Sequence, residues 1–490
     1  MSLPTSLYRA DQVRELDRRA GTELNIDGFN LMQRAGRSAW EILQGNWPQA
    51  RHLCVLCGGG NNGGDGYILA GLALEAGLQV NAMSTVDPAG LSGDARQAYQ
   101  QFMGRSGAEC RQFSPATLGD ADVVIDSLLG TGLDREVTGI FREAITAING
   151  SGKPILALDI PSGLHADSGA VMGVAVRATI TVTFVGLKQG LFTGQGRGCS
   201  GRLYFADLAL PELIFQQVKP AALRMDFSSQ SRLLQPRSRH AHKGHFGHVL
   251  VIGGDYGYAG AARMAAEAAA RSGAGLVSVA TRPEHALGIP MAIPEIMAHG
   301  IEKTIDLQPL LDRATVVAIG PGLGQSAWAS NLLARVLETH LPLVLDADAL
   351  NLLARDPIAS DRWILTPHPG EAASLLQTTT SAIAADRFAC VRSLREKFGG
   401  IVVLKGSGTL VADETMLYLC SEGNPGMASG GMGDVLTGII AGLVAQNIGL
   451  ADAARLGVCL HAAAADAAAA DGERGMLATD LMPWLRKLIN

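Results

Sequence analysis

The strongest chemical signal in the chain is an aspartate, Asp434, within the glycine-rich segment Gly423–Leu443 (GNPGMASGGMGDVLTGIIAGL). A glycine turn that runs into a helix presents consecutive backbone N–H groups, which can bind a transferring phosphoryl group. A carboxylate beside them can take the proton from an attacking hydroxyl. The segment therefore predicts phosphoryl transfer with Asp434 as the catalytic group, whereas an aspartate that only caps a helix would not account for GGMGD.

Further loops of the second half follow apolar runs in the same way. KGSGT, residues 405–409, offers Lys405 and glycine backbone to nucleotide phosphates, although a plain hairpin turn is a fair alternative. His368 lies between two prolines in TPHPGE, which suits a substrate contact better than a packed core position. Asp346 and Asp348 either lie near a metal–nucleotide complex or cap a helix.

Four histidines lie in RHAHKGHFGH, residues 239–248, without a carboxylate or cysteine at ligand spacing. We interpret this segment as a glycine-rich loop over the substrate rather than a metal site. GPGLG, residues 320–324, and GGDYGYAGAA, residues 253–262, also follow apolar runs and are interpreted as ligand loops.

Three loops of the first half carry a second set of polar residues. They are CGGGNNGGDG (57–66), DSLLGTGLDR (126–135) and DIPSGL (159–164), and each follows an apolar run. In open α/β sheets, ligands bind outside the carboxyl ends of the strands, so these loops should converge on one crevice. Taken singly, the first is explained by a tight turn without a ligand, and Asp126 or Asp159 by helix capping.

The order NNGGDG, D-x-L-x-GTGL-x-R and DIPSGL resembles the YjeF N-terminal family, the NAD(P)H-hydrate epimerases, over most of residues 10–210. The resemblance implies inversion of the hydroxyl-bearing carbon of the hydrated nicotinamide ring, with Asp159 as the acid/base group beside that ring. It also implies K+ bound by oxygen atoms of Asn62, Asp126 and Ser162. The residues implied to contact the hydrated nucleotide are Asn61, Asn62, Gly63, Gly64, Asp65, Gly130, Thr131, Gly132, Leu133, Asp134, Arg135, Glu136 and Asp159.

The combination of HKG-x-x-GHVLVIGG, GPGLG, TPHPGE, KG-x-GT and GNPGMA-x-GG-x-GD is similar to the ADP- or ATP-dependent NAD(P)H-hydrate dehydratases over about residues 225–490. Phosphorylation of the ring hydroxyl would make it a leaving group, and elimination would restore NADH or NADPH. Mg2+ would accompany ADP or ATP. Residues implied to face the hydrate are Ala259, Gly322, His368 and Asp434, and those implied to hold the nucleotide are Lys405, Gly406, Ser407, Gly408, Thr409 and Gly433.

The elements that must position these loops are alternating strands and helices. Near-continuous apolar runs at 52–57, 123–129, 155–160 and 180–185 predict buried parallel strands, as do 248–254, 276–280, 316–320, 343–348 and 401–406. Helices are predicted at 64–76, 143–148, 261–271 and 461–470. We therefore expect an α/β fold with two domains. The resemblances imply a Rossmann-like three-layer α/β/α domain over 1–218 and a ribokinase-like α/β domain over 225–490. Residues 207–230, with two prolines and a drift into Ser and Gln, mark the break.

Length and composition agree with this organisation and exclude other classes. A chain of 490 residues is too long for one hydrophobic core, and its 60 glycines favour an enzyme of the nucleotide-binding α/β type. The net charge of −6, with scattered Lys and Arg, argues against nucleic acid as a partner. No apolar run reaches membrane-helix length, the first residues do not resemble a signal peptide, and seven cysteines with irregular spacing suit reduced thiols. We therefore expect a cytoplasmic homo-oligomer without membrane partners.

Two other functions compete with bifunctional repair of hydrated NADH and NADPH. GGMGD alone would permit a ribokinase-like kinase for a small alcohol, but TPHPGE and the first half argue against it. A non-catalytic scaffold built on the first half is disfavoured because Asn62, Asp126 and Asp159 are all present.

Overall fold

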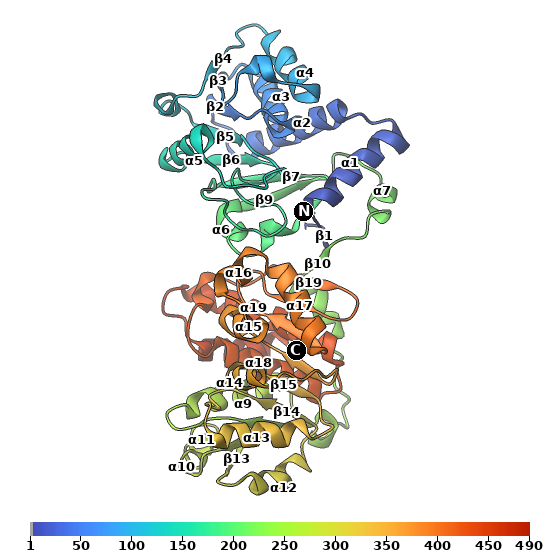
Figure 1. Ribbon diagram of the computed structural model, residues 1–490, viewed down its shortest axis with the longest axis vertical. Helices are drawn as coiled ribbons and strands as arrows, with labels where there is room; N and C mark the ends of the chain where they lie inside the picture. Colours follow the sequence, from blue (N-terminus) through green and yellow to red (C-terminus); the bar gives the residue numbers. More distant parts are fainter. Residues whose placement is uncertain (1–2) are drawn as a thin grey trace. The chain divides into compact units, whose positions relative to one another are not determined.

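The computed structural model describes residues 3–490, except the side chains of residues 116 and 117. The chain forms two compact units that divide between Leu223 and Arg224. Each unit contains a run of adjacent parallel strands with helices packed on it (Figure 1). The α/β class predicted for both halves is therefore confirmed.

The first unit contains a parallel sheet that places the three predicted loops at one edge. Its strands lie in the order β4 (Cys110–Gln112), β3 (Gln79–Ser84), β2 (His52–Cys57), β5 (Val123–Ser127), β6 (Ile155–Leu158), β7 (Ile180–Phe184) and β9 (Arg202–Ala206). In the register, Val55 of β2 pairs with Ala82 on one side and Ile125 on the other. Because β2, β5 and β6 are adjacent and parallel, the loops that follow them emerge side by side.

Both faces of this sheet are covered, which explains the near-continuous apolar strands. Leu53, Val55 and Cys57 pack with α1 (Ala10–Leu24), α2 (Gly28–Asn46), α3 (Asn61–Glu75) and α4 (Gly93–Met103). The alternate residues Cys54 and Leu56 pack with α5 (Gly139–Gly150) on the opposite face. This is the predicted three-layer arrangement. Shorter elements of the unit are β1 (Ser6–Tyr8), β8 (Leu187–Lys188), α6 (Gly196–Ser200) and α7 (Glu212–Gln216), and β1 pairs with β8 and with the start of β10 (Ala222–Met225).

The second unit has a longer sheet with an antiparallel hairpin at one side. The parallel strands lie in the order β13 (Met297–Gly300), β12 (Leu276–Thr281), β11 (His248–Ile252), β14 (Val316–Ile319), β15 (Leu343–Leu345), β16 (Trp363–Leu365) and β17 (Ile401–Leu404). β18 (Leu410–Ala412) and β19 (Leu417–Cys420) continue the sheet with antiparallel pairing. The loops after β11, β14, β15, β16 and β17 therefore share one edge.

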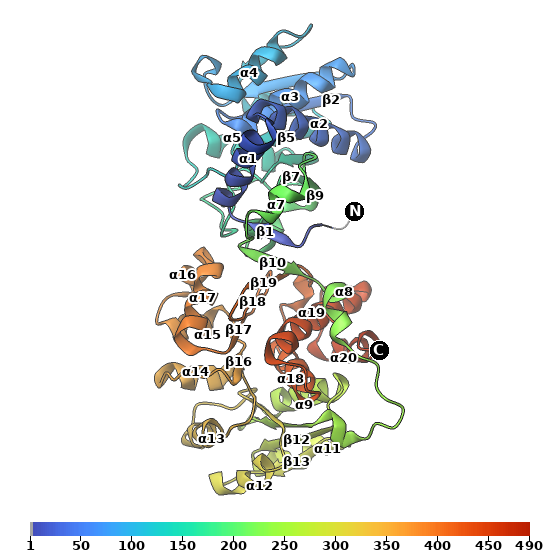
Figure 2. The same ribbon diagram turned by 90° about the vertical axis from the view of Figure 1, so that its right-hand side faces the viewer.

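Helices lie on both sides of this sheet as well (Figure 2). α9 (Ala259–Arg271), α18 (Met432–Ala445), α19 (Leu450–Ala468) and α20 (Met482–Leu488) form a large apolar cluster on one face. α13 (Ala327–Leu337), α14 (Ala347–Arg355), α15 (Pro369–Leu376), α16 (Thr380–Ala385) and α17 (Arg387–Phe398) occupy the other. A Cβ at Gly438 would lie 2.0 Å from the Ala265 carbonyl oxygen, so this glycine permits the close approach of α18 to α9.

The predicted strands are confirmed, and the helices begin earlier than predicted. The NNGGDG segment, predicted as a loop before a helix, forms the first turns of α3 from Asn61 onward. The break at 207–230 contains the short α7, β10 and α8 (Phe227–Gln230), which are too brief to show a period in the sequence. Among residues 3–490, no helix is both long enough and apolar enough to span a membrane.

Two candidate active sites

The first unit contains a cavity of about 850 Å³ at the edge where β2, β5 and β6 end. Ten of the residues predicted to contact the hydrated nucleotide line it, and they come from the start of α3 and from the loops after β5 and β6. These residues are Asn61, Asn62, Asp65, Gly130, Thr131, Gly132, Leu133, Asp134, Arg135 and Asp159. The structure thus brings together residues up to about a hundred positions apart in the sequence.

Asp159 faces the cavity immediately after β6 and adopts a positive φ of 62°. Its Oδ1 accepts a hydrogen bond from the Phe184 backbone N–H (3.2 Å) and is in contact with the Lys188 Nζ. Lys188 is almost completely buried and also donates to Thr183 Oγ1 (3.1 Å) and the Phe184 carbonyl (2.8 Å). Left-handed backbone is costly for a non-glycine residue and concentrates at functional sites, which supports a role for this carboxylate.

Two further carboxyls lie near this ion pair, Asp17 on α1 and Asp65 on α3. Burial raises the pKa of Asp17 to about 6, and Lys188 opposes this rise. Burial, and then repulsion from Asp159 and Asp17, raises the pKa of Asp65 well above its usual value. One buried ammonium group therefore faces three carboxyl groups, so at least one of the three is neutral near pH 6.

Asn62, Asp126 and Ser162 lie together at one side of the cavity, which Asn62 lines. Asp126 is fully buried and accepts hydrogen bonds from Ser162 Oγ (2.6 Å) and the Ser162 N–H (2.8 Å), and burial raises its pKa to about 6. Asn62 Nδ2 donates to the carbonyl of Leu129 (3.0 Å), whose N–H donates to Ser162 Oγ (2.8 Å). Asn62 Oδ1 is buried without a hydrogen-bond partner. An oxygen left unpaired inside a cluster of oxygen donors fits the predicted alkali-cation site.

Three residues of the predicted substrate set lie outside the cavity lining. A Cβ at Gly63 would lie 2.1 Å from the Gly58 carbonyl oxygen, and one at Gly64 would lie 2.5 Å from Met32. These glycines therefore allow α3 to pack closely. Glu136 is exposed and lies against Gly173.

The second unit gathers the carboxyl groups of Asp346, Glu371 and Asp434 around Lys405, at the ends of β15 and β17 and the starts of α15 and α18. Lys405 Nζ lies 2.5 Å from Asp346 Oδ1 and 3.7 Å from Glu371 Oε2. The other Asp346 oxygen accepts from Thr437 Oγ1 (2.8 Å). Asp346 makes no side-chain capping bond to α14, so the capping interpretation is wrong for this residue. Asp348 accepts from the Gly324 N–H (2.9 Å) and so fixes the loop after β14.

Asp434 lies in the first turn of α18, beside this cluster. Burial, together with repulsion from Asp346 and Asp348, raises the pKa of Asp434 to about 7, and Lys405 opposes this rise. A Cβ at Gly433 would lie 3.1 Å from Lys405 Nζ, so a side chain there would crowd the lysine. Asp434 at pH 7 is therefore divided between its protonated and ionised forms, as a general base should be.

The KGSGT segment is a hairpin turn between β17 and β18, as the alternative interpretation held. A buried arginine, Arg387, stabilises the turn by hydrogen bonds to its backbone. Its guanidinium donates to the carbonyls of Leu404 (3.3 Å), Lys405 (3.3 Å) and Gly408 (3.2 Å). The turn that presents Lys405 is thus fixed by hydrogen bonds from α17.

His368 caps the N-terminus of α15, where its Nδ1 accepts from the N–H groups of Gly370 (2.9 Å) and Glu371 (3.3 Å). Its side chain remains more than half exposed, and burial followed by repulsion from Lys405 lowers its pKa. Ala259 begins α9 after β11, and a Cβ at Gly322 would lie 2.7 Å from the neighbouring Tyr258. Three of the four residues predicted to face the hydrate therefore lie at one edge of the sheet, where its loops lead into helices.

Sequence reasoning missed Lys188, Asp17 and Arg387. Lys188 is the one charged residue of the apolar stretch 180–192, and a buried charge needs a partner, so its position was a usable signal. Asp17 lies on a helix with many charged residues, and nothing in the sequence distinguishes it from them. Arg387 begins α17 in a segment rich in charged residues, so its burial is equally invisible in the sequence.

The four histidines of residues 240–248 do not form a metal-ligand cluster. Within the described chain, three potential ligand atoms of His, Cys, Asp or Glu come within 4.8 Å of one another only at Cys420, Glu422 and Cys459. His242 and His245 instead stack with ring centroids 3.8 Å apart, and His248 Nε2 lies 2.8 Å from Ser278 Oγ.

Each half of the chain matches the model of a known protein family. The model of the YjeF-related protein N-terminus matches residues 28–190, and that of NAD(P)H-hydrate dehydratase matches residues 249–487. A bifunctional NAD(P)H-hydrate repair enzyme from Coxiella burnetii is 51% identical over 99% of this chain and 100% of its own. The Escherichia coli protein of the same name is 43% identical over 100% of this chain and 95% of its own.

A solved structure supports the fold of the second unit. A ribokinase-like superfamily protein from Enterococcus faecalis is 31% identical, with a TM-score of 0.51, and the match covers 54% of this chain and 94% of that one. Because the full-length relatives span both units at high identity, the chain belongs to the family of bifunctional NAD(P)H-hydrate repair enzymes.

Proposed function

We propose that the second unit, residues 224–490, dehydrates the hydrates of NADH and NADPH at the expense of ADP or ATP. The observation that carries this proposal is the position of Asp434, a carboxyl with a pKa of about 7 in the first turn of α18 and beside Lys405. Asp434 takes the proton of the ring hydroxyl as the hydroxyl oxygen attacks the terminal phosphorus. Elimination of the resulting phosphate ester restores the ring double bond.

The remaining residues of this site bind and orient the nucleotide. Lys405, Gly406, Ser407, Gly408, Thr409 and Gly433 would hold its phosphates, while Ala259, Gly322 and His368 would face the hydrate. Mg2+ would enter with the nucleotide and offset phosphate charge, and the carboxylates around Lys405 are hard oxygen donors that suit it.

The first unit, residues up to 223, would interconvert the R and S hydrates. The volume of its cavity and the polar residues that line it suit a nucleotide. Water adds to the dihydropyridine ring at a carbon next to the nitrogen, so departure of the hydroxyl is assisted by the nitrogen lone pair. Asp159 would exchange a proton with that hydroxyl, while Lys188 holds the carboxylate in place. The dehydratase then consumes the S form alone.

Both activities are tested by one assay. A mixture of the two NADH-hydrate epimers is given to the enzyme with ADP or ATP, and the absorbance of the regained NADH is followed. Complete consumption is expected. Consumption of only one epimer would contradict the epimerase, and consumption of neither would contradict the dehydratase as well.

We further propose that Asn62, Asp126 and Ser162 bind K+, which would offset the Asp126 charge and join the loops after β2, β5 and β6. The unpaired Asn62 Oδ1 supports this. We expect KCl to raise the unfolding temperature more than LiCl at equal ionic strength, because Li+ is too small for the same donors. Asn62→Leu should abolish this difference. An equal effect of both salts on the unaltered protein would refute the site.

A further inference from the structure

α1 presents one carboxyl to the cavity of the first unit. Val13, Arg14 and Asp17, which lie on one side of this helix, line the cavity together with Asp159 and Lys188. No hydrogen bond or ion pair joins Asp17 to another residue in the described part of the chain. An acidic side chain that points into a cavity without a partner is available to a ligand.

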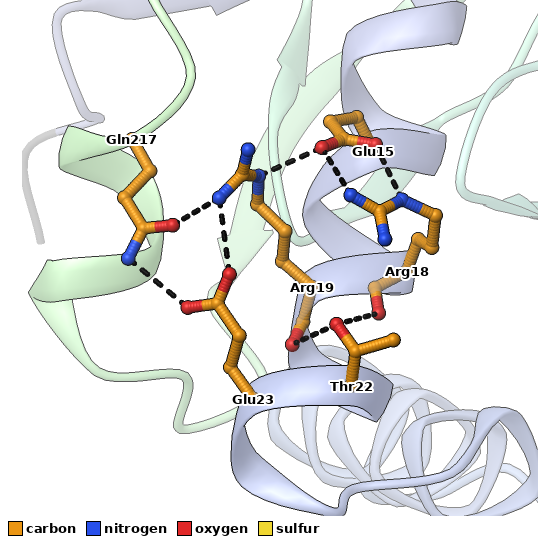
Figure 3. A network of polar contacts seen from close by, with 6 residues as sticks. All are labelled: Glu15, Arg18, Arg19, Thr22, Glu23 and Gln217. Carbon is orange, nitrogen blue, oxygen red and sulfur yellow. Dashed lines mark hydrogen bonds and ion pairs between the residues drawn. The ribbon is translucent and has the colours of Figure 1, made fainter.

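The orientation of α1 is fixed from its outer side (Figure 3). The Arg19 guanidinium donates to Glu15 (2.7 Å) and Glu23 (3.0 Å), and it contacts Gln217 of α7. Gln217 Nε2 in turn donates to Glu23 Oε2 (3.0 Å). Glu15 and Arg19 are each two positions from Asp17, about 200° around the helix. The network therefore holds the side of α1 that faces away from the cavity.

The charges facing Asp17 come from three other elements. They are Lys188 of β8, Asp159 in the loop after β6, and Asp65 of α3, with Arg14 on α1 itself. Lys188 is in contact with Asp159, whose Oδ1 it holds together with the Phe184 N–H. These contacts fix the position of Asp159, whereas burial raises the pKa of Asp17 to about 6. The cavity thus contains one carboxyl group in contact with an ammonium group and two, Asp17 and Asp65, whose proton affinity is raised by burial. Of these two, Asp17 is the more exposed and so the more accessible to a ligand.

Inversion at the hydroxyl-bearing carbon requires both a proton donor and a proton acceptor. Hydroxide is a poor leaving group, so the departing oxygen must receive a proton, and the water that adds in its place must lose one. A single carboxylate held by an ammonium group can accept a proton but has none to donate.

We propose that Asp17 is a second catalytic residue of the first unit, sharing the proton transfers of epimerisation with Asp159. This inference rests on the proposed epimerase function. Asp17 gives its proton to the hydroxyl, the C–O bond breaks with its electron pair on oxygen, and the ring nitrogen lone pair forms a C=N bond. A water molecule then adds to that carbon, its proton passes to Asp159, and the C=N pair returns to nitrogen. In the opposite conversion Asp159 donates and Asp17 accepts. Between successive conversions in the same direction, Asp159 releases its proton to solvent water and Asp17 takes one up, which restores the starting state.

The test is the Asp17→Asn variant of the full-length protein, supplied with the R epimer of the hydrate without nucleotide. Formation of the S epimer is followed by chromatography and corrected for the spontaneous rate. We expect kcat to fall about 100-fold with little change in KM, as for loss of a general acid. Dehydration of the S epimer with ADP should be unchanged. Asp11→Asn, on the same helix but exposed and paired with Arg9, should epimerise normally.

The pH profile separates catalysis from structure. For the unaltered protein, R-epimer conversion should fall as pH rises through about 6, because Asp17 loses the proton it donates. The residual activity of Asp17→Asn should lack this limb of the pH profile, that is, the fall in rate with rising pH. Asp17→Glu should recover part of the rate and should retain a limb. A normal rate in Asp17→Asn, or a reduced rate with the limb intact, overturns the proposal. If Asp17→Asn fails to fold, the Asp17→Glu variant provides the test. A full rate in that variant, with the limb at the same pH as in the unaltered protein, overturns the proposal. Absence of epimerisation by the unaltered protein would instead refute the epimerase function itself.

Discussion

At the scale of single residues, both sites depend on carboxyl groups whose proton affinity is raised by burial. Asp434 and Glu371 in the second unit each have a pKa of about 7, against values near 4 for exposed carboxyls. Lys405 lies beside both and limits the rise, because its ammonium group favours the ionised forms. The lysine therefore limits the proton affinity of the proposed base, and it lies where the nucleotide is proposed to bind.

Asp434→Asn should abolish dehydration and leave epimerisation intact. The amide keeps the shape of the side chain but cannot take the hydroxyl proton, so we expect kcat to fall by about 10²–10⁴. The regain of NADH absorbance from the S epimer with ADP measures the first effect, and chromatography of the epimers measures the second. Asp471→Asn, an exposed position, is the control. Loss of both activities in Asp434→Asn would show that the two sites are not independent.

The dehydratase should lose kcat/KM below pH 7, about tenfold per pH unit, because Asp434 must be ionised to act as a base. Stability should change in the opposite sense. Since folding raises the pKa of Asp434 and Glu371, the native state binds more protons than the unfolded state between about pH 4 and 7. Their contribution to the free energy of unfolding is present at low pH and is lost as pH rises to about 7.

Asp434→Asn and Glu371→Gln separate these effects. Glu371→Gln should keep the activity limb near pH 7, because Asp434 is still present. The fall in stability from pH 4 to pH 7, measured by urea unfolding, should be smaller in either variant than in the unaltered protein. A limb that disappears with Glu371→Gln would assign the base to Glu371 instead.

The residues of both sites were predictable where they follow strands. Asp159, Asp346 and Lys405 directly follow the carboxyl ends of β6, β15 and β17, so apolar runs in the sequence were sufficient to locate them. The positions of Asp17 and Arg387 were not predictable, because each residue lies on a helix whose orientation depends on tertiary packing.

At the scale of elements, α17 controls the turn that carries Lys405. Arg387 donates to three carbonyls of this turn, and Gly406 lies above it at a φ of 136°. A Cβ at Gly406 would lie 2.5 Å from the Arg387 guanidinium. The buried arginine and the glycine therefore together fix the backbone of the turn that is proposed to bind the nucleotide phosphates.

Arg387→Met should raise the KM for ADP or ATP and leave epimerisation unchanged. The apolar side chain fills similar volume but leaves three carbonyls without their charged donor, at a cost of about 2–4 kcal/mol in stability. Gly406→Ala should have the same effect on KM for a different reason, since alanine is strained at this φ and collides with Arg387. Initial-rate kinetics measure KM, and a normal KM in both variants would refute a role of the turn in nucleotide binding.

At the scale of the whole molecule, the fold explains why two activities can share one chain. Each unit has its own run of parallel strands, its own apolar core and its own set of polar loops at the strand ends. The two-sheet organisation was readable from the sequence because each set of strands is buried on both faces and carries near-continuous apolar residues. The division between Leu223 and Arg224 was less readable, because short elements fill the segment around it.

If the two sites act independently, they need not be on the same molecule. The Asp159→Asn variant should consume only the S epimer with ADP, and the Asp434→Asn variant should regain no NADH. A mixture of the two variants should consume both epimers, because the S epimer made by one chain can diffuse to the other. The final NADH absorbance measures this, and it should equal that of the unaltered protein. A mixture that stops at half of that absorbance would show that the epimer passes between the units of a single chain, and the separateness of the two cores would then not extend to their chemistry.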